Sequence, residues 1–159
     1  DRDAFVWMDF NDRATGDAAI LVAGTQVLLS LGTGSSIGDL LNPIRLAVLV
    51  INGFFFWVIY SGAVYGVSRY LFEGHGTYAP VLRITGFAYP TVLLIIFVNL
   101  FVSSPALVLV IGGAWFVVVV ANGMSYVADL AIEKAFGAAI GGYVLLVIVQ
   151  TILSNLRIF

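Results

Sequence analysis

The chain lacks cysteine altogether and contains a single histidine, His75. Without cysteine there can be no disulfide framework, thiolate zinc site, iron–sulfur cluster or cysteine nucleophile. One histidine with no second histidine beside it cannot build a transition-metal site. The H-E-x-x-H, Walker A and dinucleotide-binding motifs are also absent from the sequence. We therefore expect neither a metal nor any other cofactor.

Charged residues are equally scarce. They make up 10% of the 159 residues, whereas hydrophobic residues make up 61%, and the mean hydropathy is +1.06. Soluble domains are typically about 25% charged and roughly 45–50% apolar, so most of this surface must face something other than water. The formal net charge of −2 also excludes the basic balance of a nucleic-acid-binding protein. The composition predicts an integral membrane protein whose first partner is the lipid bilayer.

The positions of the charges divide the chain into membrane-spanning segments. A charge near the bilayer centre costs at least about 2.5–3.5 kcal/mol, so long uncharged intervals are candidate spans. The intervals 18–38, 46–68 and 135–156 each fit one crossing of roughly 20 residues. The interval 84–128 is too long for one helix, and we expect it to contain two.

A break near the middle of that long interval is supplied by Ser104 as helix N-cap and Pro105 as first helical residue. Runs such as 92–97 and 117–120 are apolar on every face, which favours lipid-immersed helices over a transmembrane barrel. The sequence thus predicts an all-α, polytopic protein with five transmembrane helices in one bundle. The expected single domain covers 1–159, with helices at about 18–34, 44–68, 86–102, 105–128 and 136–156.

The first helix is the weakest of the five, because Thr25, Gln26 and Ser30 dilute its apolar stretch. A re-entrant or interfacial segment is the alternative to a full crossing here. Before it, residues 1–16 carry three aromatics among acidic residues. That composition is typical of an interfacial segment at the headgroup level, or of an ordered lead-in to the first span.

Lys and Arg are distributed unequally between the two sides of such a bundle. The side of the N-terminus carries five and the opposite side carries two. Cytoplasmic loops carry an excess of Lys and Arg, so we expect the N-terminus in the cytosol and the C-terminus outside. The five are Arg2, Arg13, Arg69, Arg83 and Lys134, and the two are Arg45 and Arg157.

One stretch, 34–38, has the G-x-S-x-G pattern of serine hydrolases, which requires a histidine within reach of the serine. The expected topology puts Ser36 on the outer side and His75 on the cytosolic side, about a bilayer thickness apart. A flexible Gly/Ser loop explains the pattern better. Because no other nucleophile and base share a side, the sequence predicts a protein that is not an enzyme.

Polar residues within the expected spans are amides, without any Asp, Glu, Lys or Arg at mid-depth. Amides in membranes commonly join helices by hydrogen bonds worth about 0.6–2 kcal/mol each. Alternatively, they line a polar path for a transported solute, although ion-coupled transporters usually need ionisable groups there. The four amides are Asn52, Asn99, Asn122 and Gln150.

Two pairs of glycines are spaced four residues apart, as in tightly packed transmembrane helices. We expect them to be helix-packing positions, either within one chain or between two copies. The pairs are Gly62 with Gly66 and Gly137 with Gly141.

The segment 86–90, Gly-Phe-Ala-Tyr-Pro, lies at the expected cytosolic entry of the third helix. Pro90 removes one backbone hydrogen bond and presses on the carbonyl of Gly86, so we expect a kink. Gly86, Tyr89 and Pro90 thus form a candidate helix-entry motif. It is interpreted either as a plain bend or as a pivot beneath the preceding loop.

At these residues the chain resembles the Yip1 family of small polytopic membrane proteins. The similar stretch is 65–78, YGVSRYLFEGHGTY, followed by GFAYP at 86–90. It matches the family's pattern of a second helix, a glycine-containing cytosolic loop and a Gly-aromatic-x-x-Pro-like entry to the third helix. The five-helix layout extends the similarity over most of the chain.

The resemblance implies a membrane-embedded, non-enzymatic protein. Eukaryotic members act in vesicle traffic and contact small prenylated GTPases, but this chain as given has no long cytosolic N-terminal region, so GTPase binding is not expected. One Lys beside six Arg and a pI near 5.0 indicate a prokaryotic member in a plasma membrane.

The leading functional hypothesis is a scaffold or adaptor that engages another membrane protein, or a second copy of itself, or shapes the bilayer through its cytosolic loops. The expected contact residues lie in or beside the loop between the second and third helices. They are Arg69, Glu73, His75 and Arg83. The alternative hypothesis is a small transporter or channel subunit that uses the membrane amides as its polar path.

Overall fold

A computed structural model describes residues 11–155, which form helices and connecting loops, with no strand in that range. Five helical stretches are long and apolar enough to cross a membrane, one of them built from three consecutive elements. The prediction of an all-α, five-span membrane protein is therefore confirmed. The elements are α2 (Arg13–Gly32), α3 (Ile37–Leu40), α4 (Pro43–Leu71), α5 (Tyr78–Ala88), the 3₁₀ helix η1 (Tyr89–Leu93), α6 (Leu94–Phe101), α7 (Pro105–Val127) and α8 (Ile132–Asn155).

The first span, α2, is long enough for a full crossing, which favours that interpretation over a re-entrant segment. It begins at Arg13, so the end of the expected interfacial segment 1–16 is already part of the span. Residues 1–10 of that segment lie outside the described residues.

Local sequence sets where two of the spans begin. Asn42 precedes α4, and its side-chain oxygen accepts hydrogen bonds from the backbone N–H groups of Ile44 and Arg45, at 3.0 and 3.3 Å. Such caps satisfy N–H groups that have no partner within the helix. The expected break before α7 is confirmed, since Ser104 is the N-cap and Pro105 the first helical residue, although the Ser104 side chain makes no capping bond.

The third span begins earlier than the sequence indicated. Its first element, α5, starts at Tyr78 and not near residue 86, so Pro90 lies well inside the span. The expectation failed because Arg83 was taken to mark the end of a loop. In the structure Arg83 lies on α5 and is 5% exposed, and its guanidinium pairs with the exposed Asp12 at the start of α2.

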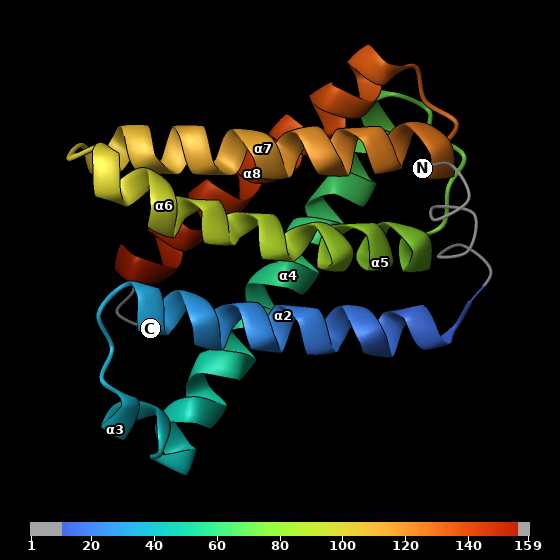
Figure 1. Ribbon diagram of the computed structural model, residues 1–159. Coiled ribbons are helices and arrows are strands. Elements are labelled where there is room, and N and C mark those ends of the chain that lie inside the picture. The colour runs from blue at the N-terminus through green and yellow to red at the C-terminus, as the bar shows by residue number, and fades with distance from the viewer. Residues whose placement is uncertain (1–10, 156–159) are drawn as a thin grey trace.

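Figure 1 shows α2, the α5–η1–α6 span and α7 side by side, with α4 and α8 crossing them. The main apolar core lies where α4, α5, α7 and α8 meet, around Tyr60, Val64, Phe116 and Met124. Large apolar side chains are widely exposed on the outer faces of the spans, as on α4 and α7. An outer surface of this kind suits lipid rather than water.

Small residues on α8 allow a close approach of α4. A Cβ atom at Gly137 would lie 2.7 Å from Cζ of Phe72, and one at Gly141 would lie 3.2 Å from Cγ1 of Val67. Gly142, which the four-residue spacing did not single out, is more constrained, because its Cβ would lie 3.1 Å from the backbone nitrogen of Val64, which cannot move aside as a side chain can. Close packing at the second glycine pair is therefore present within one chain.

The first glycine pair behaves differently and makes no close contact within the chain, which leaves packing between two copies as the remaining prediction for it. A Cβ atom at Gly62 or at Gly66 would meet no other atom within 4 Å in the described structure. The reason is helix orientation, since the buried stripe of α4 passes through Ser61 and Val64, while Gly62 is exposed.

Candidate functional site

The loop between α4 and α5, residues 72–77, is fixed by backbone hydrogen bonds. The N–H of Gly74 donates to the carbonyl of Ser68 at 2.9 Å, at the end of α4. The N–H of His75 donates to the carbonyl of Ala128 at 3.2 Å, in the corner between α7 and α8. Two segments distant in sequence are thereby joined into one surface at one end of the bundle (Figure 1).

Both joined segments hold a residue in the left-handed backbone region. Within residues 11–155, the two non-glycine residues with positive φ are Glu73, at 57°, and Asp129, at 51°. Such conformations cost of order 1–3 kcal/mol and persist where the surroundings determine them. The loop therefore has a defined conformation that its surroundings impose.

Charged and polar side chains project from this surface, which we call the loop face and define by Arg69, Glu73, His75, Asp129 and Lys134. All five are exposed. The Arg69 guanidinium also donates from Nη1 to the carbonyl of Gly74 at 3.4 Å. The loop face thus carries both signs of charge, and hydrogen bonds hold the backbone of its loop in place.

An aromatic residue lies beside the loop face at the end of α4. Tyr70 is 84% exposed. Tyrosine is enriched both at membrane–water interfaces and at binding hot spots, because one end of its ring system is apolar and the other polar.

Arg83, the fourth expected contact residue, is not part of the loop face. Its Nε donates to the hydroxyl of Thr15 at 2.9 Å, and its Nη2 lies 2.8 Å from a carboxylate oxygen of Asp12. Both partners belong to the start of α2. Arg83 therefore joins α5 to α2, whereas Arg69, Glu73 and His75 lie together at the surface.

The expected helix-entry motif lies inside the bundle, where α2, α4 and α5 meet. A Cβ atom at Gly86 would lie 2.6 Å from Cβ of Ala18 and 2.9 Å from Cζ2 of Trp57, so only glycine fits there without movement. The indole N–H of Trp57 donates to the carbonyl of Leu82 at 3.0 Å, which holds α4 against α5. The segment around Pro90 is the 3₁₀ helix η1, so the expected irregularity is present.

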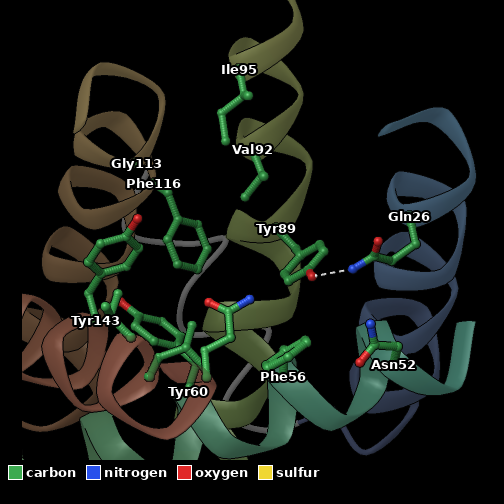
Figure 2. Close-up of a pocket in the computed structure, with 13 residues that line it drawn as sticks. Gln26, Asn52, Phe56, Tyr60, Tyr89, Val92, Ile95, Gly113, Phe116 and Tyr143 are labelled. Atoms are coloured by element: carbon green, nitrogen blue, oxygen red, sulfur yellow. Dashed lines mark hydrogen bonds between the residues drawn. The ribbon is translucent and has the colours of Figure 1, made fainter. Parts of the chain in front are cut away.

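Tyr89, the third residue of the motif, borders a cavity of about 320 Å³ between the spans. Figure 2 shows Gln26 and Asn52 on one side of this cavity and Tyr60 and Tyr143 on the other. Every span contributes to its wall. The residues are Gln26 from α2, Asn52, Phe56 and Tyr60 from α4, Tyr89, Val92 and Ile95 from η1 and α6, Gly113 and Phe116 from α7, and Tyr143, Leu146, Val147 and Gln150 from α8.

Hydrogen bonds position some of the polar groups around the cavity. The Nε2 of Gln26 donates to the hydroxyl oxygen of Tyr89 at 2.7 Å, as Figure 2 shows. The hydroxyl of Tyr60 donates to the carbonyl of Ala139 at 3.2 Å, between α4 and α8. In contrast, Oδ1 of Asn52 is buried and accepts no hydrogen bond from any described residue.

The four amides expected within the membrane divide into two groups. Asn52 and Gln150 line the cavity. Asn99 and Asn122 are exposed on the outside of the bundle, and Nδ2 of Asn122 donates within its own helix to the carbonyl of Val118 at 2.8 Å. A polar path lined by all the membrane Asn residues is therefore wrong.

Gln26, Tyr60 and Tyr143 were not predicted from the sequence to belong to a polar site. Gln26 carried a signal, as a polar residue in an otherwise apolar helix, but it was interpreted as a weakness of that span. The tyrosines gave none, because membrane helices contain tyrosine at many depths.

The G-x-S-x-G stretch leads into α3 (Ile37–Leu40), at the end of the bundle opposite the loop face (Figure 1). Ser36 and His75 are therefore at opposite ends, as the topology predicted. Within residues 11–155, no group of three or more His, Asp or Glu side chains gathers where a metal ion could be held.

Residues 8–154 match the family model described as the Yip1 domain, which covers nearly the whole chain. No curated protein and no solved structure matches the chain.

Proposed function

The chain belongs to the Yip1 family, and from that premise we propose that it is a non-enzymatic membrane scaffold that holds another membrane protein at its loop face. The main support for this proposal is that the backbone hydrogen bonds of Gly74 and His75 hold the loop in place. A surface with a defined conformation costs less entropy to bind than a mobile loop.

The charges of the loop face support a protein partner. Arg69 and Lys134 share an exposed surface with Glu73 and Asp129. Mixed charges on a backbone that is held in place favour a partner with the complementary arrangement, which gives specificity more than raw affinity. If the partner were only an anionic lipid surface, the cationic side chains would bind it more strongly without the carboxylates beside them.

We further propose that the loop face is cytosolic, with the C-terminus outside, in a prokaryotic plasma membrane. The excess of Lys and Arg on the side of the N-terminus supports this orientation. The same end of the bundle holds Arg13 at the start of α2 and Lys134 at the start of α8.

Co-purification tests the scaffold role. The chain is extracted from its native membranes in polymer-bounded lipid discs, and accompanying proteins are quantified by mass spectrometry. We expect a near-stoichiometric membrane protein with the wild type, reduced at least tenfold by the double variant Arg69→Ala and Glu73→Ala. Arg45→Ala, at the opposite end of the bundle, is the matched control and should retain the partner. Equal recovery with both variants would contradict the proposal.

A second candidate function, a small transporter or channel subunit, is favoured by the cavity between the spans and by Asn52 in its wall. It predicts solute flux in reconstituted vesicles that Asn52→Leu reduces while co-purification of any partner is unchanged. Flux that is indifferent to Asn52→Leu would count against it.

A further inference from the structure

The side chain of Asn52 leaves a hydrogen-bonding requirement unmet. Its Oδ1 is buried among apolar helices and accepts no hydrogen bond from a described residue. The Nε2 of neighbouring Gln26 directs one of its two N–H groups to the hydroxyl of Tyr89. An unsatisfied buried acceptor typically costs about 1–3 kcal/mol, and buried polar atoms generally have a partner from the protein, from water or from a ligand. A donor that enters the cavity would meet this requirement.

The chemistry of the wall limits what this partner can be. The thirteen residues that line the cavity, all within the described part of the chain, include amides, tyrosines and apolar side chains but no Asp, Glu, Lys, Arg or His. A charged group would lose its hydration there without gaining a counter-charge. The volume of about 320 Å³ is at the lower end of small-molecule sites. An uncharged donor on a slender apolar body fits these conditions.

A second hollow lies between α7 and α8 and adjoins the cavity. Its volume is about 350 Å³, and it is lined by apolar residues such as Val110 and Ile140, which are half exposed or more. Gly113 and Tyr143 line both the hollow and the cavity. Tyr143 therefore lies where the two spaces adjoin, and a Cβ at Gly113 would lie 3.3 Å from its hydroxyl oxygen.

We propose that the cavity binds an uncharged membrane amphiphile, whose hydroxyl donates to Oδ1 of Asn52 and whose chain extends past Tyr143 toward the bilayer. This site goes beyond the scaffold role and does not depend on it. The loop face and the cavity lie on different parts of the bundle and share no residue.

Photolabelling with a lipid probe tests this site. The full chain is reconstituted in phosphatidylcholine vesicles with a monoacylglycerol that carries a diazirine in its acyl chain and an alkyne tag. A lysophosphatidic acid with the same chain is the charged counterpart. After irradiation, labelled peptides are identified by mass spectrometry. We expect the monoacylglycerol to label cavity residues such as Phe116, in competition with unlabelled monoacylglycerol, and the charged probe to label only outer residues such as Phe97.

Three variants test whether the labelling depends on the proposed contacts. Asn52→Leu should reduce cavity labelling about fivefold, the effect expected for one lost hydrogen bond. Asn122→Leu makes the same change on the outside of α7 and should leave labelling unchanged. Tyr143→Ala should raise the initial rate of labelling, because it removes the side chain where the hollow and the cavity adjoin.

The competition measurement on the wild-type chain needs no variant, so it decides the outcome even if Asn52→Leu fails to fold. Cavity labelling that is not displaced by unlabelled monoacylglycerol, or that is equal for the two probes, would overturn the proposal. Labelling confined to outer residues would also overturn it, and would indicate that the cavity holds only water. Neither result would affect the co-purification test of the scaffold role.

Discussion

Arg83 is a cation held within the bundle by residues of another helix. Its side chain is 6% exposed, whereas the carboxylate side chain of Asp12 that faces it is fully exposed. Ion pairs with an exposed partner contribute little, because water screens the charges. The part-buried hydrogen bond to Thr15 and the packing of the long side chain therefore contribute more than the pairing with Asp12.

We expect Arg83→Ala to lower the free energy of unfolding by about 1–3 kcal/mol, since it leaves a gap and an unpaired hydroxyl between α2 and α5. Asp12→Asn should have a much smaller effect. Thermal unfolding in detergent, followed by tryptophan fluorescence, measures both. An equal loss of stability for the two variants would contradict this account of Arg83.

At the scale of elements, the contact between α4 and α8 depends on small residues in register. Gly142 lies directly over the backbone of Val64, so an added methyl group cannot be accommodated by side-chain rotation alone. Gly62 on α4 offers a matched control in a membrane helix, because a Cβ there meets no neighbour within 4 Å.

Gly142→Ala should therefore destabilise the bundle by about 1–3 kcal/mol, as overpacking typically does. Gly62→Ala should be neutral or slightly stabilising, since alanine is the better helix former. Melting temperatures of the two variants under identical lipid conditions provide the comparison. Stabilisation by Gly142→Ala would show that α4 and α8 do not pack as closely as described.

In the third span, the irregularity at Pro90 could be predicted from the sequence, whereas the start at Tyr78 could not. Pro90 disrupts the helix as its chemistry requires, and η1 is the result. The start of the span at Tyr78 was not predictable from charge positions, because the burial of Arg83 depends on Thr15 and Asp12 of a distant helix. Local sequence determines the irregularity, and tertiary packing determines the boundary.

Replacing Pro90 with Ala should restore a backbone N–H that can donate to the carbonyl of Gly86 and should extend α5 through η1. The straightened span would move Tyr89 away from Gln26. Hydrogen exchange of the peptides that cover 86–93 is expected to slow in the variant, with peptides from α8 as the internal reference. Unchanged exchange would indicate that the 3₁₀ geometry is imposed by the neighbouring helices and not by proline.

For the whole molecule, the number of spans and the all-α architecture could be predicted from the scarcity and spacing of charges. The cavity could not, because helices that are apolar on nearly every face give no indication of which side faces the interior. Asn52 and Asn122 are chemically identical in the sequence, yet one lines the cavity and the other faces outward. Likewise, the loop face exists only because His75 reaches Ala128, a contact that no local pattern encodes.

The absence of native cysteine makes the topology directly measurable. Single cysteines at His75 and at Thr33, on opposite ends of the bundle, are treated with a membrane-impermeant maleimide in intact cells and in lysed cells. We expect His75→Cys to react only after lysis and Thr33→Cys to react in both. The reverse pattern would invert the proposed orientation and place the loop face outside.

Site-specific photocrosslinking in native membranes shows whether the loop face holds a membrane protein. A photoreactive amino acid is placed at His75 on the loop face and, as the control, at Ser103 in the short turn at the opposite end. We expect a discrete protein adduct from His75 that Glu73→Ala diminishes, and none from Ser103. Adducts of equal yield from both positions, or from neither, would contradict the scaffold role.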